Sequence, residues 1–226
     1  MTTPRIAVIL CGSGRGDGSE ITEAVSTLVH LSKAGATYRC FALNSPQHHV
    51  INHATGQVEE GQTRNQMVEA ARISRGEISD LATLNASDFD AVIFPGGFGA
   101  AKNLCTFALN GAECSVQPQV DRVVKAFHAA GKPIGLICIA PVIGARVLGR
   151  ASGGPGVNVT VGKDTGVGQA IASWGSTPTE KCVTEVCIDG QHKVVSTPAY
   201  MFEAKPHEVF EGIGNLVTEV IGLCKR

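Results

Sequence analysis

Short hydrophobic runs alternate along this chain with segments whose hydrophobic positions repeat every three or four residues. Residues 5–11 form the first run and predict a strand that is buried on both faces. Residues 21–31 then place aliphatic side chains at helical spacing, and Gly35 predicts the end of that helix. Residues 37–43 return to a strand pattern, so the chain opens with a strand–helix–strand unit.

The same alternation continues to the end of the chain. Residues 44–62 predict a loop or small hairpin, and residues 182–188 and 192–195 predict an antiparallel strand pair around the turn signal Asp189-Gly190. Strands that alternate with helices predict a doubly wound, mostly parallel sheet, in one domain over residues 1–226. The remaining strands are predicted at 91–94, 133–137 and 157–161, and the remaining helices at 63–75, 116–130, 139–148, 166–174 and 206–224.

Composition narrows the classes of function. The 226 residues are 43% hydrophobic and carry a formal net charge of -1 without a basic block, which argues against a nucleic acid or a membrane surface as partner. No apolar stretch reaches the ~20 residues of a membrane span, and no signal peptide precedes the first strand. The eight cysteines include no Cys-x-x-Cys pair, so we expect free thiols and no metal site. These features predict a cytoplasmic protein, or a mitochondrial matrix protein if a transit peptide has been removed.

Cys138 is the strongest candidate for chemistry. It follows the predicted strand 133–137 and stands just before Ile139, where a helix is predicted to begin. This strand-to-helix turn resembles the nucleophile elbow of hydrolases, with cysteine in place of serine. The unpaired N–H groups and the positive dipole end of the helix favour a thiolate, so the turn predicts a lowered thiol pKa. The alternative is a small buried core residue, as most free cysteines are.

Two further strand ends carry candidate residues, and ligands of open α/β sheets bind at such ends. Asp17 and Glu20 have the spacing of a capping box, with Asp17 as the N-cap, which leaves Glu23 without a local role. A carboxyl group turned toward a cysteine could share a proton with its sulfur, although a solvated first-turn acid is the alternative. Residues 95–99 (PGGFG) expose backbone N–H groups that suit an oxyanion site, or form an ordinary turn.

Other motifs are weaker. The glycine-rich loop 12–18 matches neither the dinucleotide-binding pattern nor the phosphate loop, so no nucleotide cofactor is predicted. His48, His49 and His53 could be metal ligands, but a polar loop explains them better. No histidine follows Cys138 until His192, so no cysteine–histidine pair is evident nearby.

The motifs together resemble the ElbB glyoxalase family. The resemblance covers nearly the whole chain in order and is most specific in the decapeptide 95–104 (PGGFGAAKNL). It is also carried by segments 17–20, 50–53, 64–65, 71–73, 131–135, 138–141 and 197–201. The eukaryotic relatives of this family are the mitochondrial glutamine amidotransferase-like class 1 domain-containing proteins, and all belong to the PfpI peptidase-like superfamily.

The resemblance implies a flavodoxin-like three-layer sandwich with an antiparallel hairpin added to a mostly parallel sheet, and a homodimer. It implies a nucleophile at Cys138, assisted by Glu23, with the backbone N–H groups of Gly97 and Ile139 as the oxyanion hole. The implied activity is cofactor-independent conversion of glyoxal, or a related small dicarbonyl, to a hydroxy acid. The positions assigned to substrate binding are Gly12, Glu20, Gly96 and Phe98.

One departure from the superfamily bears on the mechanism. Its deglycases and peptidases place a histidine directly after the nucleophile or on the following strand, but Ile139 follows Cys138 and residues 157–164 contain no histidine. Catalysis would therefore depend on Cys138 and Glu23 alone.

A non-catalytic redox-sensing or ligand-binding protein is the alternative hypothesis, in which Cys138 is oxidised to a sulfinic acid that Glu23 stabilises. A weaker option is an amidase-like subunit that needs another chain to complete its site.

Overall fold

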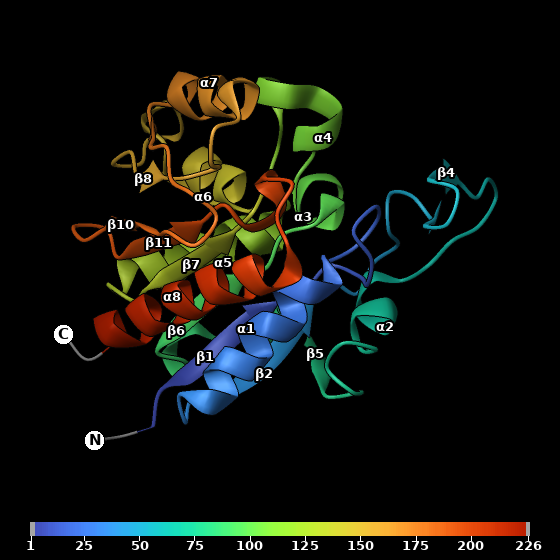
Figure 1. Ribbon diagram of the computed structural model, residues 1–226, viewed down its shortest axis with the longest axis horizontal. Coiled ribbons are helices and arrows are strands. Elements are labelled where there is room, and N and C mark those ends of the chain that lie inside the picture. Colours follow the sequence, from blue (N-terminus) through green and yellow to red (C-terminus); the bar gives the residue numbers. More distant parts are fainter. Residues whose placement is uncertain (1–2, 225–226) are drawn as a thin grey trace.

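A seven-stranded sheet runs through the centre of the computed structural model, which describes residues 3–224 (Figure 1). The strand order is β10-β11-β7-β6-β1-β2-β5, and every neighbouring pair is parallel except β10 and β11. The predicted parallel sheet with an antiparallel hairpin is thus confirmed. The strands are β1 (Arg5–Ile9), β2 (Thr37–Ala42), β5 (Ile78–Asp80), β6 (Ala91–Phe94), β7 (Ile134–Ile137), β10 (Cys187–Asp189) and β11 (Val194–Thr197).

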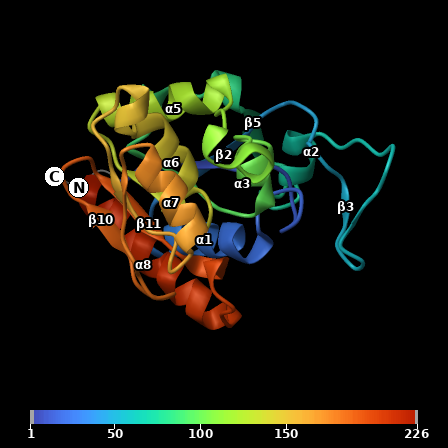
Figure 2. The same ribbon diagram turned by 90° about the horizontal axis from the view of Figure 1, so that it is seen from above.

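Helices cover both faces of this sheet and make the three-layer sandwich (Figures 1 and 2). Alternate residues of β1 point to opposite faces. Ile6 and Val8 belong to the core under α1 (Ile21–Lys33) and α8 (Pro206–Cys224), which contact each other. On the other face, the core includes Ala7 and Ile9 and lies under α5 (Pro118–Ala129) and α6 (Pro141–Leu148).

Smaller elements surround the carboxyl ends of the parallel strands. The helices α3 (Phe98–Lys102), α4 (Phe107–Asn110) and α7 (Thr165–Ser173) lie together there, whereas a hairpin of β3 (Ile51–Asn52) and β4 (Gln57–Val58) extends away from the body (Figures 1 and 2). The other short elements are α2 (Gln66–Ala70), a separate pair of strands β8 (Asn158–Val159) and β9 (Thr177–Pro178), and 3₁₀ turns at Leu81–Thr83, Ala86–Asp88, Gly111–Glu113, Arg150–Ser152 and Ala199–Met201.

Several predicted boundaries were wrong. The strand predicted at 157–161 is only β8 and pairs with β9 outside the central sheet, because Asn158 N–H donates to the Asp189 carboxylate and Thr160 N–H donates to the Ser196 hydroxyl. The helix predicted at 63–75 shortens to α2, since Asn65 caps it and tight turns follow Ala70. The edge strand β5 was not predicted.

No helix within residues 3–224 is long and apolar enough to span a membrane.

Candidate active site

Cys138 occupies a strained turn between β7 and α6. Its φ of 61° lies in the left-handed region, which is uncommon for a residue other than glycine. The turn is held by the Cys138 N–H, which donates to the Thr197 carbonyl at the end of β11 at 2.9 Å. This geometry is that of the predicted nucleophile elbow, and it turns the thiol away from the strand toward the carboxyl edge of the sheet.

Glu23 lies beside this thiol on the inner face of α1. Its side chain is fully buried and lies against the Cys138 thiol. The Gly96 N–H donates to Glu23 Oε2 at 2.9 Å, and the Tyr200 N–H lies 3.5 Å from Oε1. Backbone groups from two other strand ends therefore fix the carboxyl group against the sulfur.

Burial sets the protonation of this pair. It raises the pKa of Glu23 to about 8, and the charge of Glu20 adds to the effect. Burial and then the Glu23 carboxylate raise the pKa of the Cys138 thiol well above its usual range, against the opposing effect of the Gly97 and Ile139 N–H groups. The N–H groups near the helix terminus lower the thiol pKa as expected, but burial outweighs them, so the expected net decrease was wrong in direction. Burial therefore favours the protonated forms of both groups.

The backbone N–H groups of Gly97 and Ile139 both approach the Cys138 sulfur. Gly97 has a φ of 92°, and a β-carbon there would lie 2.4 Å from the Glu20 nitrogen. A β-carbon on Gly96 would lie 2.5 Å from Cys138 Cβ and 2.7 Å from Glu23 Oε2. Glycine is thus required at both positions for the strand ends to approach so closely. The role of these N–H groups as an oxyanion hole stays a prediction.

A cavity of about 410 Å³ opens over Cys138. Of the four positions predicted to bind substrate, Glu20 and Phe98 line this cavity. Gly96 lies beneath the cysteine–glutamate pair, and Gly12 lies against Gln47 and Gly18 outside the lining. The structure thus brings Cys138, Glu20, Glu23, Gly96, Gly97, Phe98 and Ile139 together and leaves Gly12 aside.

Sequence reasoning missed several residues of this cavity. Arg15, Phe107, Asp164 and Tyr200 line it from four separate segments, and no spacing in the sequence links them. Tyr200 could have been suspected, because it lies in segment 197–201, which carries part of the family resemblance. The residues that line the cavity, all in the described part of the chain, include no histidine.

Glu20, not Asp17, is the N-cap of α1. Glu20 Oε2 accepts a hydrogen bond from the Glu23 N–H at 2.7 Å, and its half-burial raises its pKa. The predicted cap was wrong because the glycine-rich loop folds back before the helix begins, with Gly18 N–H donating to the Gly14 carbonyl. Asp17 is therefore free for a contact far along the chain.

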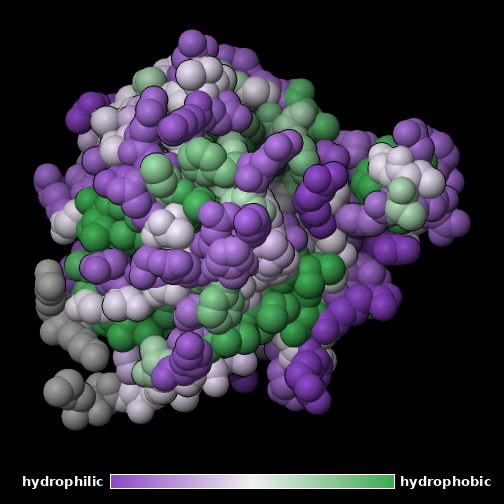
Figure 3. Space-filling view, viewed as in Figure 1, coloured by the Kyte–Doolittle hydropathy of each residue, from purple (hydrophilic) through white to green (hydrophobic). Residues whose placement is uncertain are grey.

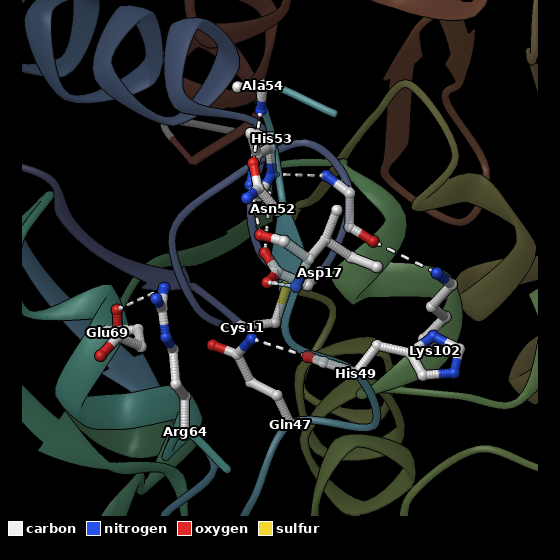
Figure 4. Close-up of polar contacts among 12 residues, drawn as sticks. Cys11, Asp17, Gln47, His49, Asn52, His53, Ala54, Arg64, Glu69 and Lys102 are labelled. Carbon is white, nitrogen blue, oxygen red and sulfur yellow. Dashed lines mark hydrogen bonds and ion pairs between the residues drawn. The ribbon is translucent and has the colours of Figure 1, made fainter. Parts of the chain in front are cut away.

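That contact is the Asp17–His53 cluster, which joins the glycine-rich loop to the β3–β4 hairpin. Asp17 Oδ2 accepts the Ile51 N–H at 2.8 Å, and its Oδ1 lies 3.6 Å from His53 Nε2. Figure 4 shows both side chains with Lys102, whose ammonium donates to the Gly16 carbonyl at 3.2 Å. His53 Nδ1 faces the Ile51 carbonyl, so this nitrogen carries the proton, and Nε2 accepts the Gly16 N–H.

Loop contacts explain His53, whereas His49 Nδ1 is buried without a hydrogen-bond partner among the described residues. His53 ties the hairpin, and the rings of His48 and His49 lie against each other, 4.3 Å apart between centroids. Across residues 3–224, no three His, Cys, Asp or Glu side chains are grouped so that they could hold a metal ion.

Comparison with known proteins finds relatives that share much of their sequence with this chain over nearly its whole length. The chain is 50% identical over 231 aligned positions to the human "Glutamine amidotransferase-like class 1 domain-containing protein 3, mitochondrial", an alignment that covers 98% of the chain and 84% of the relative. The crystal structure of an Ehrlichia chaffeensis "isoprenoid biosynthesis protein with amidotransferase-like domain" is 31% identical, with a TM-score of 0.90 over 98% of this chain and 99% of that one. A ThiJ/PfpI domain protein from Brachyspira murdochii, 15% identical, shares the fold with a TM-score of 0.57, covering 98% of each chain. No family model matches the chain.

Proposed function

The chain belongs to the family of glutamine amidotransferase-like class 1 domain-containing proteins, and within this family we propose that it is a cofactor-independent glyoxalase. It converts glyoxal or a related small dicarbonyl to a hydroxy acid, with Cys138 as the nucleophile. The single observation that carries this proposal is the placement of the fully buried Glu23 carboxyl group against the Cys138 thiol, which lines a cavity.

The chemistry needs one nucleophile and one proton carrier. The Cys138 sulfur attacks an aldehyde carbon of glyoxal, and the thiol proton passes by way of the Glu23 carboxyl group to the aldehyde oxygen, which gives a hemithioacetal. The Gly97 and Ile139 N–H groups stabilise the oxyanion that develops in this step. The hydrogen on that carbon then moves through an enediol to the neighbouring carbonyl carbon, which leaves a hydroxyacyl thioester. Water hydrolyses the thioester to glycolate and restores the thiol, so that glyoxal and one water account for every atom of the product.

Glu23 suits the role of proton carrier. A general acid–base works best when its pKa lies near the working pH, and burial raises the pKa of Glu23 to about 8. Its two oxygens receive the Gly96 and Tyr200 N–H groups, so the carboxyl group stays oriented while it gains and loses a proton. This arrangement allows proton transfer without the histidine that other members of the superfamily use.

The test is glycolate formation from glyoxal by the wild type, Cys138→Ala and Glu23→Gln. We expect no turnover above background for Cys138→Ala and a loss of roughly 100-fold or more for Glu23→Gln, the range of general acid–base catalysis. Cys182→Ala is the matched control, because Cys182 is an exposed free cysteine. Equal rates in all four proteins would remove the proposal.

A redox sensor is the second candidate function, favoured by the cavity's lack of histidine among the described residues that line it. In this case a peroxide oxidises Cys138 to a sulfinic acid, whose oxygens the Glu23 carboxyl group and the neighbouring N–H groups hold. Mass spectrometry after mild peroxide treatment distinguishes the two. Selective oxidation at Cys138 together with no turnover of dicarbonyls would favour the sensor.

We also propose that the protein forms a homodimer and lies in the mitochondrion, the second of which the name of the human relative gives for that protein. On α1, Ile21, Val25 and Val29 form a stripe at four-residue spacing and are 49%, 42% and 38% exposed. Figure 3 shows hydrophobic side chains at the surface over this helix. A second copy would bury this stripe. Light scattering should give the mass of two chains for the wild type and of one chain for Val25→Asp. A monomeric wild type would contradict this assembly.

A further inference from the structure

The cavity over Cys138 is much larger than glyoxal requires. At about 30 Å³ per heavy atom, the four heavy atoms of glyoxal fill on the order of 100 Å³. The cavity measures about 410 Å³, within the range of pockets that hold drug-sized ligands. Glyoxal alone would therefore leave most of this space to water.

The walls around the extra space are apolar. Phe98 from α3, Phe107 from α4 and Val167 from α7 line the cavity together with Met201. Water forms few hydrogen bonds with apolar walls. An apolar group that displaces this water is stabilised, because its own surface leaves bulk solvent. The space beside the reacting sulfur is thus suited to an apolar part of a substrate.

This wall is held in place without a ligand. The Phe107 ring packs edge-on against Trp174, with centroids 5.9 Å apart and planes at 78°. Trp174 is buried, and its Nε1–H donates to the Ala112 carbonyl at 2.8 Å. The Phe98 N–H donates to the Arg15 carbonyl at 2.8 Å, which fixes the start of α3. A binding surface that is organised in advance costs a ligand less ordering.

The charged residues of the cavity do not select a charged substrate. Arg15 supplies one cation, and Glu20 and Asp164 supply two carboxyl groups. Both carboxyl groups are already engaged, because Glu20 accepts from the Glu23 N–H and Asp164 accepts from the Val167 N–H. A neutral body therefore fits this lining better than a strongly anionic or cationic one.

We propose that the substrate class of this site is the 2-oxoaldehydes that carry a neutral, apolar body such as a ring or branched chain. This inference rests on the proposed glyoxalase function. The Cys138 sulfur attacks the terminal aldehyde, and the thiol proton passes to the aldehyde oxygen. The hydrogen on that carbon then moves to the adjacent carbonyl carbon, and water cleaves the C–S bond of the resulting thioester to release a 2-hydroxy acid and restore the thiol. One 2-oxoaldehyde and one water give one hydroxy acid, and no oxidant or reductant takes part.

The experiment compares kcat/KM for phenylglyoxal with that for glyoxal, using Cys138→Ala to correct for uncatalysed consumption. We expect a preference of at least 10-fold for phenylglyoxal in the wild type, in line with the selectivity of apolar pockets. Phe107→Ala should lower this ratio about 10-fold. Leu109→Ala, an exposed leucine on the same helix that does not line the cavity, should leave the ratio unchanged. A wild-type ratio of one or less overturns the inference.

A binding measurement separates this inference from the proposed function. If no dicarbonyl is turned over, the glyoxalase proposal fails, and the affinity of the cavity is then measured by NMR titration with the unreactive amides mandelamide and glycolamide. We expect mandelamide to bind at least 10-fold more tightly, and this preference to fall in Phe107→Ala. Equal affinities in the wild type would overturn the apolar-body inference whether or not turnover occurs.

Discussion

Two contact networks at the carboxyl edge of the same sheet differ in what they hold together. Around Cys138 and Glu23, the partners are backbone groups: the N–H groups of Gly96, Gly97 and Ile139. In the Asp17–His53 cluster, side chains hold two loops together, and the buried Asp17 carboxylate receives the Ile51 N–H of the hairpin. In both networks a buried carboxyl group receives a backbone N–H, but the first packs Cys138 and Glu23 closely against Gly96, whereas the second joins two loops.

This difference determines how each network can be damaged. Backbone donors cannot be removed by substitution, so the site around Cys138 is disturbed by adding atoms where strands approach closely. The Asp17–His53 cluster is disturbed by removing atoms, because its partners then lose their hydrogen bonds. We therefore expect larger effects on activity from the first network and local effects on the hairpin from the second.

Gly96→Ala should have the largest effect. The added β-carbon would lie 2.5 Å from Cys138 Cβ, 2.7 Å from Glu23 Oε2 and 2.9 Å from the Ile137 carbonyl oxygen, so the pair must separate. We expect a loss of activity of about 100-fold, as for a displacement of about 1 Å, and a destabilisation of about 1–3 kcal/mol. Dicarbonyl turnover and urea unfolding measure the two effects.

Gly190→Ala is the matched control for Gly96→Ala. A β-carbon on Gly190 meets no atom within 4 Å, and its backbone is outside the left-handed region. We expect turnover like that of the wild type and a free energy of unfolding within about 0.5 kcal/mol of it. If both variants behave alike, close packing at Gly96 is not what organises the site.

Glu23 should make the protein less stable as the pH rises. Its pKa is about 8 when folded, against an ordinary value of 4.5, so the folded state holds the proton more tightly than the unfolded state. Its favourable contribution is complete below pH 4.5 and is lost between about pH 4.5 and 8. At 1.36 kcal/mol per pKa unit, the loss is on the order of a few kcal/mol.

Urea unfolding of the wild type and Glu23→Gln at pH 5 and pH 8 checks this expectation. Glutamine cannot ionise, so the wild type should lose more stability between the two values than Glu23→Gln does. A parallel decline in both proteins would mean that Glu23 does not carry the buried proton. Asp17→Asn retains Glu23 and should lose stability between the two pH values as the wild type does.

The two networks also differ in how far the sequence predicts them. The Cys138 turn, the PGGFG segment and Glu23 were found because each follows a strand or begins a helix, and strand ends of a parallel sheet converge. The pairing of Asp17 with Ile51 crosses 34 positions and depends on how two loops fold back. Local spacing instead favoured Asp17 as a helix cap, which was wrong.

The thiol pKa shows the same limit at the site itself. A helix terminus next to cysteine is visible in the sequence and correctly predicts N–H groups near the sulfur. The extent of burial is not visible, because it depends on how α1 and the segments after β6 and β11 close over Cys138. Burial outweighs the helix terminus, so the predicted direction was reversed.

Asp17→Ala should destabilise the hairpin with a moderate effect. It leaves the Ile51 N–H without its acceptor, at a cost of about 1–3 kcal/mol. Limited proteolysis should then cut within residues 51–62 more rapidly than in the wild type. Glu77→Ala, which removes an exposed carboxylate elsewhere, should not change the cleavage rate. Equal cleavage in the wild type and Asp17→Ala would show that the cluster does not anchor the hairpin.

Gly222→Ala should have the smallest effect, with the opposite sign to Gly96→Ala. Gly222 lies in α8, and a β-carbon there meets no atom within 4 Å. Alanine restricts the unfolded chain and suits a helix better than glycine, so we expect a gain of about 0.5–1 kcal/mol in the free energy of unfolding. Thermal unfolding measures this gain, and turnover should not change. A loss of stability would imply that glycine is needed in α8 as well, and the contrast between the tightly packed site and the rest of the fold would then weaken.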